Sequence, residues 1–313
     1  MSETQTCWYI VVNPHAGSGK TMPEWAKAEK RLKALNIPFV AGYSQYRMHA
    51  KALAYAAASE GYRNILAVGG DGTVHEVLCG LMRYAEEKDI EPEEFCFGVL
   101  PIGSGNDWIK SLGIPHNLDK MLEMVADGTR SRMDVVKVES SDGVSYMANV
   151  GGMGFDSHVC ERVNRQKAHG RVLKAIYLRA LFHTVRWIRP INATVRVDGE
   201  EFFSGSLYSL AMGNGPYSGG GMRQVPDAVY DDGLLDFMVC PKVPLKRIVR
   251  EIPRLFNGTV RDSGILKMGR CKELEIMAER EEIYEVDGEI EGRLPVRISM
   301  TGHKINIVAE ERH

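Results

Sequence analysis

The sequence predicts two domains of different classes: an α/β domain with an open, mostly parallel sheet, followed by a mainly antiparallel β domain. Its 313 residues exceed the roughly 250–300 at which single hydrophobic cores usually stop growing. In residues 1–132, short β-branched runs alternate with helical stretches, which is the pattern of a parallel sheet covered by helices. In residues 133–300, short strands follow one another with turns between them, which is typical of antiparallel pairing.

The composition is that of a globular protein. Hydrophobic residues make up 44% and charged residues 26% of the chain. The net charge of −2 provides no overall attraction to nucleic acid, so we expect no nucleic-acid partner. Six widely spaced cysteines without a CxxC pair indicate reduced thiols, and the polar first residues lack a signal-peptide pattern. We therefore expect a cytoplasmic protein.

The expected elements follow from local patterns of apolar residues. In the first half, strands are expected at 8–12, 64–68 and 95–100, and helices at 25–35 and 74–85. In the second half, strands are expected at 135–138, 145–150, 193–197, 206–212, 234–240, 274–277, 283–286 and 296–308. One long helix, at 171–188, interrupts this series.

The loop after the first strand is rich in small residues. Residues 13–21 nearly fit the P-loop spacing GxxxxGK(S/T), but Pro14 stands where the first glycine belongs, so a Walker A motif is rejected. The turn at Gly17 and Gly19 still offers backbone N–H groups to an anion. Thr21 is spaced with Glu24 as a capping box for the next helix. A tight turn without a ligand remains the alternative for this loop alone.

The second loop, Gly69-Gly70-Asp71-Gly72-Thr73, combines three glycines with a carboxylate. The glycines let the backbone approach a ligand closely. A carboxylate beside phosphates is repelled unless a cation or a hydroxyl intervenes, so Asp71 indicates Mg²⁺, a ribose or a substrate hydroxyl. Thr73 and Glu76 have the spacing of a capping box, which makes Glu76 a cap rather than a catalyst. A purely structural Asp71 is the alternative.

The third loop, residues 101–107, repeats this arrangement before another helix. Loops at the carboxyl ends of successive parallel strands converge where open α/β sheets bind ligands. Together, the three loops predict a nucleotide phosphate site. None of them matches GxGxxG followed by an acidic residue about twenty positions later, which argues against a dinucleotide redox enzyme.

Two acidic segments of the second half are candidates for chemistry. Carboxylates crowd a turn within residues 225–236, an oxygen-ligand environment that suits Mg²⁺ or Ca²⁺, although a solvated turn is equally compatible. Residues 281–291 contain six acids and no base. Within them, Asp287 precedes Gly288 at an expected bend, where a carboxylate can take a proton from a substrate hydroxyl. Asp198 stands in the same Asp-Gly-Glu sequence, so the tripeptide alone does not choose between the two.

The long helix at 171–188 lies in a basic region. Residues 161–190 contain eight Lys and Arg and one acid. Apolar residues inside a basic outer face suit peripheral contact with an anionic membrane. An ordinary solvated helix is the alternative, because scattered exposed Leu and Phe are common.

Taken together, these residues resemble the diacylglycerol kinase catalytic-domain superfamily, in particular the soluble bacterial lipid kinases, with sphingosine and ceramide kinases as relatives. The resemblance covers nearly the whole chain. The motifs that carry it stand in this order: Asn13-Pro14 through Gly19, Gly69-Gly70-Asp71-Gly72-Thr73 with Glu76, Pro101-x-Gly103-Ser104-x-Asn106-Asp107, Asn214 with Gly219-Gly220-Gly221, Asp232-Gly233-x-Leu235-Asp236, and Val286-Asp287-Gly288-Glu289.

The resemblance implies an ATP-dependent kinase of a lipid hydroxyl such as that of diacylglycerol. It implies an NAD kinase/phosphofructokinase-like α/β domain at 1–132, to which 301–313 returns, and a β-sandwich domain for the lipid substrate at 133–300. Nucleotide contacts are implied at Asn13, Gly17, Ser44, Gly69, Gly70, Asp71, Gly72, Thr73, Ser104 and Asn106. Asp287 is implied as the catalytic base, with Asp71 as a second catalytic residue. A structural Mg²⁺ maps to the Asp232 side chain and the Val229 and Leu234 carbonyls.

Three substitutions relative to the family's commoner residues are visible. Ser44 and Ser104 stand where threonine is more frequent, and both keep the hydroxyl. Trp108 stands where phenylalanine is more frequent, which leaves the fine specificity open. Two other functions stay open: an NAD kinase-like enzyme that acts on a soluble substrate, and a non-catalytic nucleotide or lipid sensor on the same fold.

Overall fold

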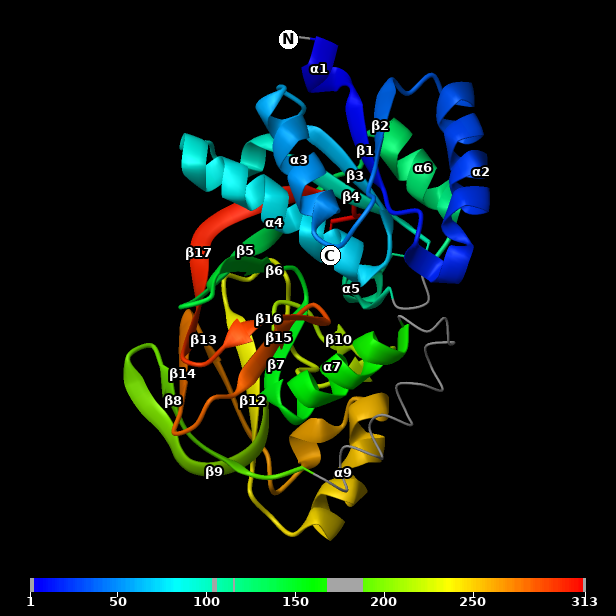
Figure 1. Ribbon diagram of the computed structural model, residues 1–313. Coiled ribbons are helices and arrows are strands. Elements are labelled where there is room, and N and C mark those ends of the chain that lie inside the picture. Colours follow the sequence, from blue (N-terminus) through cyan, green and yellow to red (C-terminus); the bar gives the residue numbers. More distant parts are fainter. Residues whose placement is uncertain (1–2, 103–105, 115, 168–187, 312–313) are drawn as a thin grey trace. The chain divides into compact units, whose positions relative to one another are not determined.

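The computed structural model describes residues 3–102, 106–114, 116–167 and 188–311 (Figure 1). Ser104 and all but the last residue of the predicted basic helix 171–188 lie outside the described residues. The chain divides into two compact units. Unit 1 comprises Met1–Val135 and His303–His313, and unit 2 comprises Val136–Gly302. Unit 1 is therefore assembled from both ends of the sequence.

Unit 1 alternates strands and helices. Its strands are β1 (Trp8–Val12), β2 (Phe39–Tyr43), β3 (Asn64–Gly69), β4 (Cys96–Pro101) and the end of β17 (Val296–Ile307). Its helices are α1 (Glu3–Thr6), α2 (Thr21–Ala34), α3 (His49–Ser59), α4 (Asp71–Lys88), α5 (Asp107–Ser111) and α6 (Leu118–Asp127), with short 3-10 turns η1 (Ala16–Gly19) and η2 (Pro92–Glu94).

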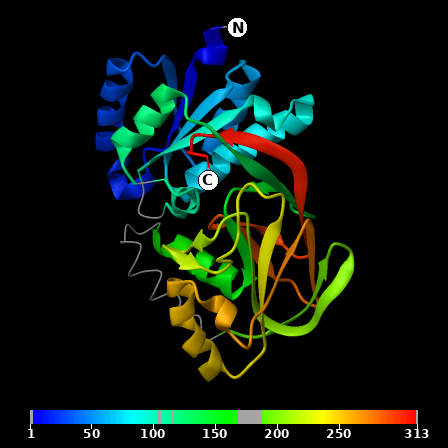
Figure 2. The same ribbon diagram turned by 180° about the vertical axis from the view of Figure 1, so that it is seen from behind.

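The sheet of unit 1 is parallel and covered on both faces. Its strand order is β2-β1-β3-β4-β17, and every described pairing in it is parallel. Helix α2 packs with α6, and α3 packs with α4; the two views show these pairs on opposite sides of the sheet (Figures 1 and 2). The central strands are buried almost throughout. The predicted α/β class is confirmed.

Unit 2 is rich in strands. They are β5 (Ser131–Ser140), whose start belongs to unit 1, β6 (Gly143–Met147), β7 (Val150–Gly154), β8 (Ile191–Val197), β9 (Glu200–Gly213), β10 (Tyr217–Ser218), β11 (Met222–Arg223), β12 (Leu235–Pro241), β13 (Lys267–Cys271), β14 (Glu273–Ala278), β15 (Ile283–Val286), β16 (Glu289–Arg293) and most of β17. Its described helices are α7 (Phe155–Lys167) and α9 (Leu245–Asn257), with the 3-10 turn η3 (Val260–Asp262).

The strands of unit 2 form an antiparallel, β-sandwich-like domain. The long strand β9 is antiparallel to β8, β7 and β12, and the hairpin β15–β16 continues from β7. Aliphatic side chains from these strands, together with Phe237 and Tyr284, form one buried core. The predicted antiparallel class of the second domain is confirmed.

Local details differ from the sequence expectations. Neither predicted capping box forms. Thr21 Oγ1 donates to the Ala16 carbonyl at 2.8 Å instead. Helix α4 begins at Asp71, so Thr73 already lies within it, and the Glu76 carboxylate accepts the amides of Met48 and Ala50 at the start of α3. A contact between helices replaces the local one, because tertiary packing brings the start of α3 within reach of Glu76.

Two further properties bear on function. All six cysteines are free, and burial raises the pKa of Cys96, Cys240 and Cys271 to about 12, which keeps these thiols protonated at neutral pH. None of the helices in the described part of the chain combines the length and the apolar character that crossing a bilayer requires.

Candidate active site

The loops that leave the parallel sheet of unit 1 start at one edge. Asn13 follows β1, Ser44 follows β2, Gly70 follows β3 and Ile102 follows β4. Backbone hydrogen bonds connect these exits: the Ser44 amide donates to Val12 at 2.9 Å, and the Ile102 amide donates to Gly69 at 3.1 Å. We call this set of loops the carboxyl edge. It brings together the described nucleotide-contact residues that the sequence predicts.

A hydrogen bond joins the first two glycine loops. Asn13 Nδ2 donates to Thr73 Oγ1 at 3.1 Å, and Asn13 Oδ1 accepts the His15 amide at 3.0 Å. The close approach of Thr73 requires a glycine at position 69, because a Cβ there would lie 2.3 Å from Thr73 Oγ1. The glycine at position 69 is thus needed to make room for the Thr73 side chain.

The turn of the first loop contains two glycines with positive φ values. Gly17 and Gly19 both have positive φ values, of 59° and 86°, which L side chains rarely adopt. Nothing lies within 4 Å of a Cβ built on Gly19. The backbone of this turn is therefore unobstructed there, which suits the approach of a phosphate group.

The Asp71 carboxylate holds the start of α5. Its two oxygens accept the backbone amides of Asp107 and Trp108, both at 3.1 Å. These amides lie in the first turn of α5, where they have no partner within the helix. Asp71 therefore caps a helix that begins 36 residues later in the sequence.

Two residues that the sequence analysis named, Asn106 and Trp108, lie at the start of α5. Asn106, which precedes the helix, is buried and its Nδ2 lies 2.7 Å from His116 Nε2. Trp108 is 2% exposed, stacks on Phe97 of β4 with ring centroids 5.1 Å apart, and donates its indole N–H to Met133 Sδ. The tryptophan is thus a core residue of unit 1.

In unit 2, Asp287 occupies the tight turn between β15 and β16. Val286 pairs with Glu289, so Asp287 and Gly288 are the two central residues, and both have positive φ values, of 52° and 84°. This is the type I′ geometry that Asp-Gly sequences favour. The carboxylate is held by two backbone amides, from Ala148 at 2.9 Å and from Asn149 at 2.8 Å.

The second Asp-Gly-Glu sequence forms a closely similar turn. Asp198 and Gly199 connect β8 to β9 with φ values of 51° and 89°. The Asp198 carboxylate likewise accepts two successive amides, from Lys272 and Glu273, at 2.9 Å each. Asp198 is exposed, whereas Asp287 is 9% exposed. The two turns differ in burial and in hydrogen-bond geometry, since both amides donate to one oxygen of Asp198, whereas Asp287 accepts one amide on each oxygen.

Asn149 connects the Asp287 turn to the glycine-rich loop that follows β9. Its side-chain amide donates to the Tyr217 carbonyl at 2.6 Å, and its own carbonyl accepts the amides of Asn214 and Gly215. The sequence analysis did not single out Asn149. The signal that could have found it is an asparagine directly before the glycine-rich strand β7.

A buried carboxylate, Asp156, supports the same loop. It accepts hydrogen bonds from Ser209 and Gln224, and Gln224 in turn accepts one from Ser218. Burial raises the pKa of Asp156 to about 6, although both of these donors act in the opposite direction. The loop is thus tied to Asp156 as well as to Asn149.

The predicted magnesium site contains a positively charged side chain. Arg270 forms ion pairs with both Asp232 and Asp236. Arg270 is on β13, directly opposite Asp236 of β12, and the second Asp232 oxygen accepts the Leu234 amide at 3.1 Å. Mg²⁺ prefers a set of oxygen ligands. The Arg270 guanidinium is a positive charge that lies against the one side-chain ligand and would repel a cation there, so the predicted set of Val229, Asp232 and Leu234 does not fit Mg²⁺ in this arrangement.

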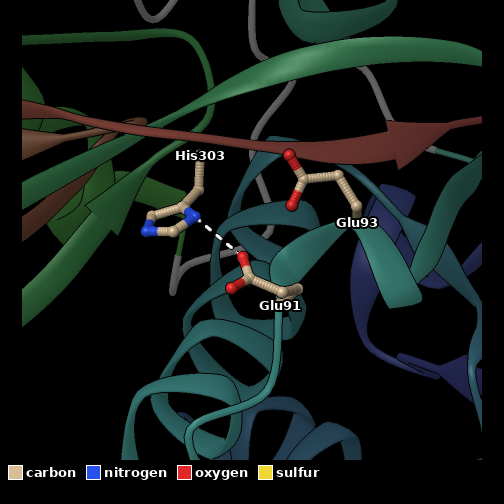
Figure 3. Close-up of side chains that lie close together, drawn as sticks. All are labelled: Glu91, Glu93 and His303. Carbon is tan, nitrogen blue, oxygen red and sulfur yellow. Dashed lines mark ion pairs between the residues drawn. The ribbon is translucent and has the colours of Figure 1, made fainter.

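Another acidic cluster lies in unit 1. Ligand atoms of Glu91, Glu93 and His303 all lie within 4.8 Å of one another, and all three residues are exposed (Figure 3). His303 Nδ1 is 3.0 Å from a Glu91 oxygen, and Glu93 accepts the Lys304 amide at 3.0 Å. We attribute this cluster to the attachment of the end of β17 to the segment before β4.

Comparisons with known proteins identify two families along the chain. Residues 7–138 match the diacylglycerol kinase catalytic domain, and residues 149–309 match the YegS C-terminal NAD kinase beta sandwich-like domain. A protein of Mycobacterium tuberculosis named diacylglycerol kinase is 27% identical over 292 residues, which cover 92% of this chain and 90% of that protein.

Other relatives agree with this assignment. A protein of Xanthomonas oryzae pv. oryzae named "Probable lipid kinase YegS-like" is 28% identical over 247 residues, which cover 78% of this chain and 77% of that protein. The crystal structure of a diacylglycerol kinase from Bacillus anthracis has a TM-score of 0.73 at 21% identity and covers 97% of both chains. At this identity, the structural likeness shows the fold alone.

The buried Asp156 predicts a pH-dependent stability difference. The folded state binds the Asp156 proton more tightly than the unfolded state, because burial raises the pKa from 3.8 to about 6. The stabilisation from this proton is complete below pH 3.8, the unfolded-state pKa, and is lost as the pH rises to about 6, the folded-state pKa. Relative to Asp156→Asn, the wild-type free energy of unfolding should fall by about 3 kcal/mol across this window and stay constant above it. Urea unfolding from about pH 4 to 8 measures this; a pH-independent difference would contradict it.

Because Arg270 pairs with Asp232 and Asp236, we expect the folded protein to be stable without a bound divalent cation at this turn. EDTA should leave the thermal midpoint of the nucleotide-free wild type unchanged within about 1 °C. Arg270→Ala should cost about 1–2 kcal/mol, because it leaves the buried Asp236 unpaired, and should make the midpoint rise with Mg²⁺. Arg297→Ala, which removes an exposed pair with Glu273, is the matched control. A fall in the wild-type midpoint on EDTA addition would instead support a resident metal.

Proposed function

The chain belongs to the family of the YegS C-terminal NAD kinase beta sandwich-like domain, with a match to the diacylglycerol kinase catalytic domain before it, and on this premise we propose that it is an ATP-dependent lipid kinase. It would transfer the γ-phosphoryl group of ATP to a hydroxyl of a lipid such as diacylglycerol. The names of the relatives, diacylglycerol kinase and YegS-like lipid kinase, support the class of acceptor. The observation that carries the chemistry is the Asp287 carboxylate, buried and oriented by two amides on a tight turn.

In this proposal, ATP binds at the carboxyl edge of unit 1. Asn13, Ser44 and the loop from Gly69 to Thr73 lie there, and the residue before α4, Gly70, has no side chain of its own to cap the helix start. A helix start of this kind favours phosphate groups. Gly17, Asn106 and Ser104 complete the proposed contacts, although Ser104 lies outside the described residues.

Mg²⁺ would accompany ATP and neutralise charge on the transferring phosphoryl group. The Asp71 carboxylate lies at the carboxyl edge, and we assign to it the placement of this ion or of the acceptor hydroxyl. Its hydrogen bonds to Asp107 and Trp108 already fix its orientation relative to the third loop. Asp71 would thus combine a structural role with a part in catalysis.

Asp287 would act as the general base. The lipid hydroxyl gives its proton to the Asp287 carboxylate while its oxygen forms the new bond to the γ-phosphorus, and the bond from that phosphorus to ADP breaks. The amides of Ala148 and Asn149 hold the carboxylate in a fixed orientation for this transfer. Catalysis would rest mainly on positioning and charge neutralisation.

We further propose that the protein is cytoplasmic and contacts an anionic membrane peripherally, as a water-soluble enzyme with a lipid substrate must. The sequence assigns this contact to the basic segment 171–188, most of which lies outside the described residues.

The class of substrate can be tested directly. Incubation with ATP labelled in its γ-phosphate and a total lipid extract should yield a labelled product that partitions into chloroform, and added diacylglycerol should increase its yield. Thin-layer separation of the products measures this. A labelled water-soluble product would favour an NAD kinase-like activity on a soluble substrate. ATP that stays intact with mixed lipids would favour a non-catalytic sensor.

The two Asp-Gly turns offer a matched test of the base. Asp287→Asn should lower kcat at least about 100-fold, since a positioned base contributes about 10²–10⁴-fold. Asp198→Asn, in the corresponding exposed turn, should leave kcat within about twofold, and each variant should lose about 1 kcal/mol of stability. If Asp287→Ala keeps normal turnover while Asp71→Ala abolishes it, the base is Asp71.

A further inference from the structure

Helix α9 presents apolar side chains to solvent. None of its residues, Leu245–Asn257, is buried. Leu245, Val249 and Phe256 are 37%, 45% and 45% exposed, although large aliphatic and aromatic side chains usually lie in a core. At about 100° per residue, the three lie within about 40° of one another on the helix. They form one stripe, which we call the α9 stripe.

Basic side chains lie beside and opposite the α9 stripe, since Lys246, Arg250 and Arg247 stand about 80°, 120° and 180° from its centre on the helix. Lys246, Arg247 and Arg250 are exposed and make no ion pair with any described residue, whereas the remaining cation, Arg254, pairs with the helix's one acid, Glu251. Three positive charges without an ion pair in the described part of the chain thus share the helix with three exposed apolar side chains. A helix with this distribution lies in the plane of an anionic membrane surface.

The helix is fixed to unit 2 on another side. It packs against β11 and η3, and in both views it lies at the periphery of this unit (Figures 1 and 2). Its left-handed cap at Gly258 ends the helix just before η3. The α9 stripe is therefore a feature of a folded surface and not of a detached segment.

We propose that α9 docks the protein on bilayers that contain anionic lipid. Charge complementarity favours this partner over a second copy of the chain, since a symmetric contact through α9 would bring the unpaired cations of both copies together. The chain's own segment 168–187 is a poor partner for the same reason, because it contains four Lys and Arg and no acid. The inference rests on the proposed function only for the reason to dock, since a lipid acceptor would lie in the membrane.

The test is the flotation of the full chain with vesicles in the absence of ATP and diacylglycerol. Vesicles of phosphatidylcholine with about one third phosphatidylglycerol should bind the wild type, and pure phosphatidylcholine should bind it at least tenfold more weakly. Arg250→Glu should weaken the binding roughly thirtyfold, because two unit charges change at the surface, whereas Arg196→Glu on β8 should change it less than threefold. Val249→Ser should weaken the binding, whereas Val144→Ser, at a site of equal exposure, should not.

The outcomes separate this inference from the kinase proposal. Equal binding to both kinds of vesicle, or equal effects of Arg250→Glu and Arg196→Glu, would overturn the docking role of α9. So would a dimer in sedimentation velocity that Phe256→Ser dissociates, since the α9 stripe would then face a second copy. Kinase activity on detergent-dispersed lipid reports on the proposed function alone and should be the same in wild type and Arg250→Glu.

Discussion

Single carboxylates that each accept two backbone amides fix the geometry of this protein. Asp71 holds the start of α5, Glu76 holds the start of α3, and Asp287 holds the backbone between β6 and β7. A charged acceptor makes each of these bonds stronger than a neutral one would be, and none depends on a long, flexible side chain. The starts of α3 and α5 and the backbone between β6 and β7 are therefore held by contacts within the protein and do not need a ligand.

The class of each unit could be predicted from local patterns, whereas the partners of the key carboxylates could not. Short runs of β-branched residues at β1, β3 and β4 alternate with helical stretches, and this alternation predicted the parallel sheet. Residue spacing likewise suggested that Glu76 caps its own helix, but the carboxylate reaches α3. A capping box is a local signal, and here the competing contact is a tertiary one that residue spacing does not reveal.

Tertiary contacts in the candidate site were likewise not visible in the sequence. Acids crowd residues 225–236, and the family resemblance implied Asp232 as a metal ligand, but Arg270, 38 residues further along the chain, pairs with this carboxylate. Only the antiparallel pairing of β12 with β13 brings its guanidinium opposite Asp236. The Asp-Gly-Glu tripeptide alone also left Asp198 and Asp287 equivalent, and only the family resemblance favoured Asp287. Their burial separates them, and burial depends on the whole of unit 2. Helix α9 was missed because its apolar residues do not face a core.

The entry of β17 into the sheet of unit 1 has a consequence for synthesis. Ile305, Ile307 and Val308 are buried beside β4, and the Val308 side chain approaches the space that a side chain at position 98 would need. On the ribosome, the other strands of this sheet emerge before Val136–Gly302, and its last strand emerges after it. Until then, the edge of β4 stays open. Unit 1 thus completes its fold after unit 2 has been made, and the nascent chain must tolerate an unpaired strand edge for that interval.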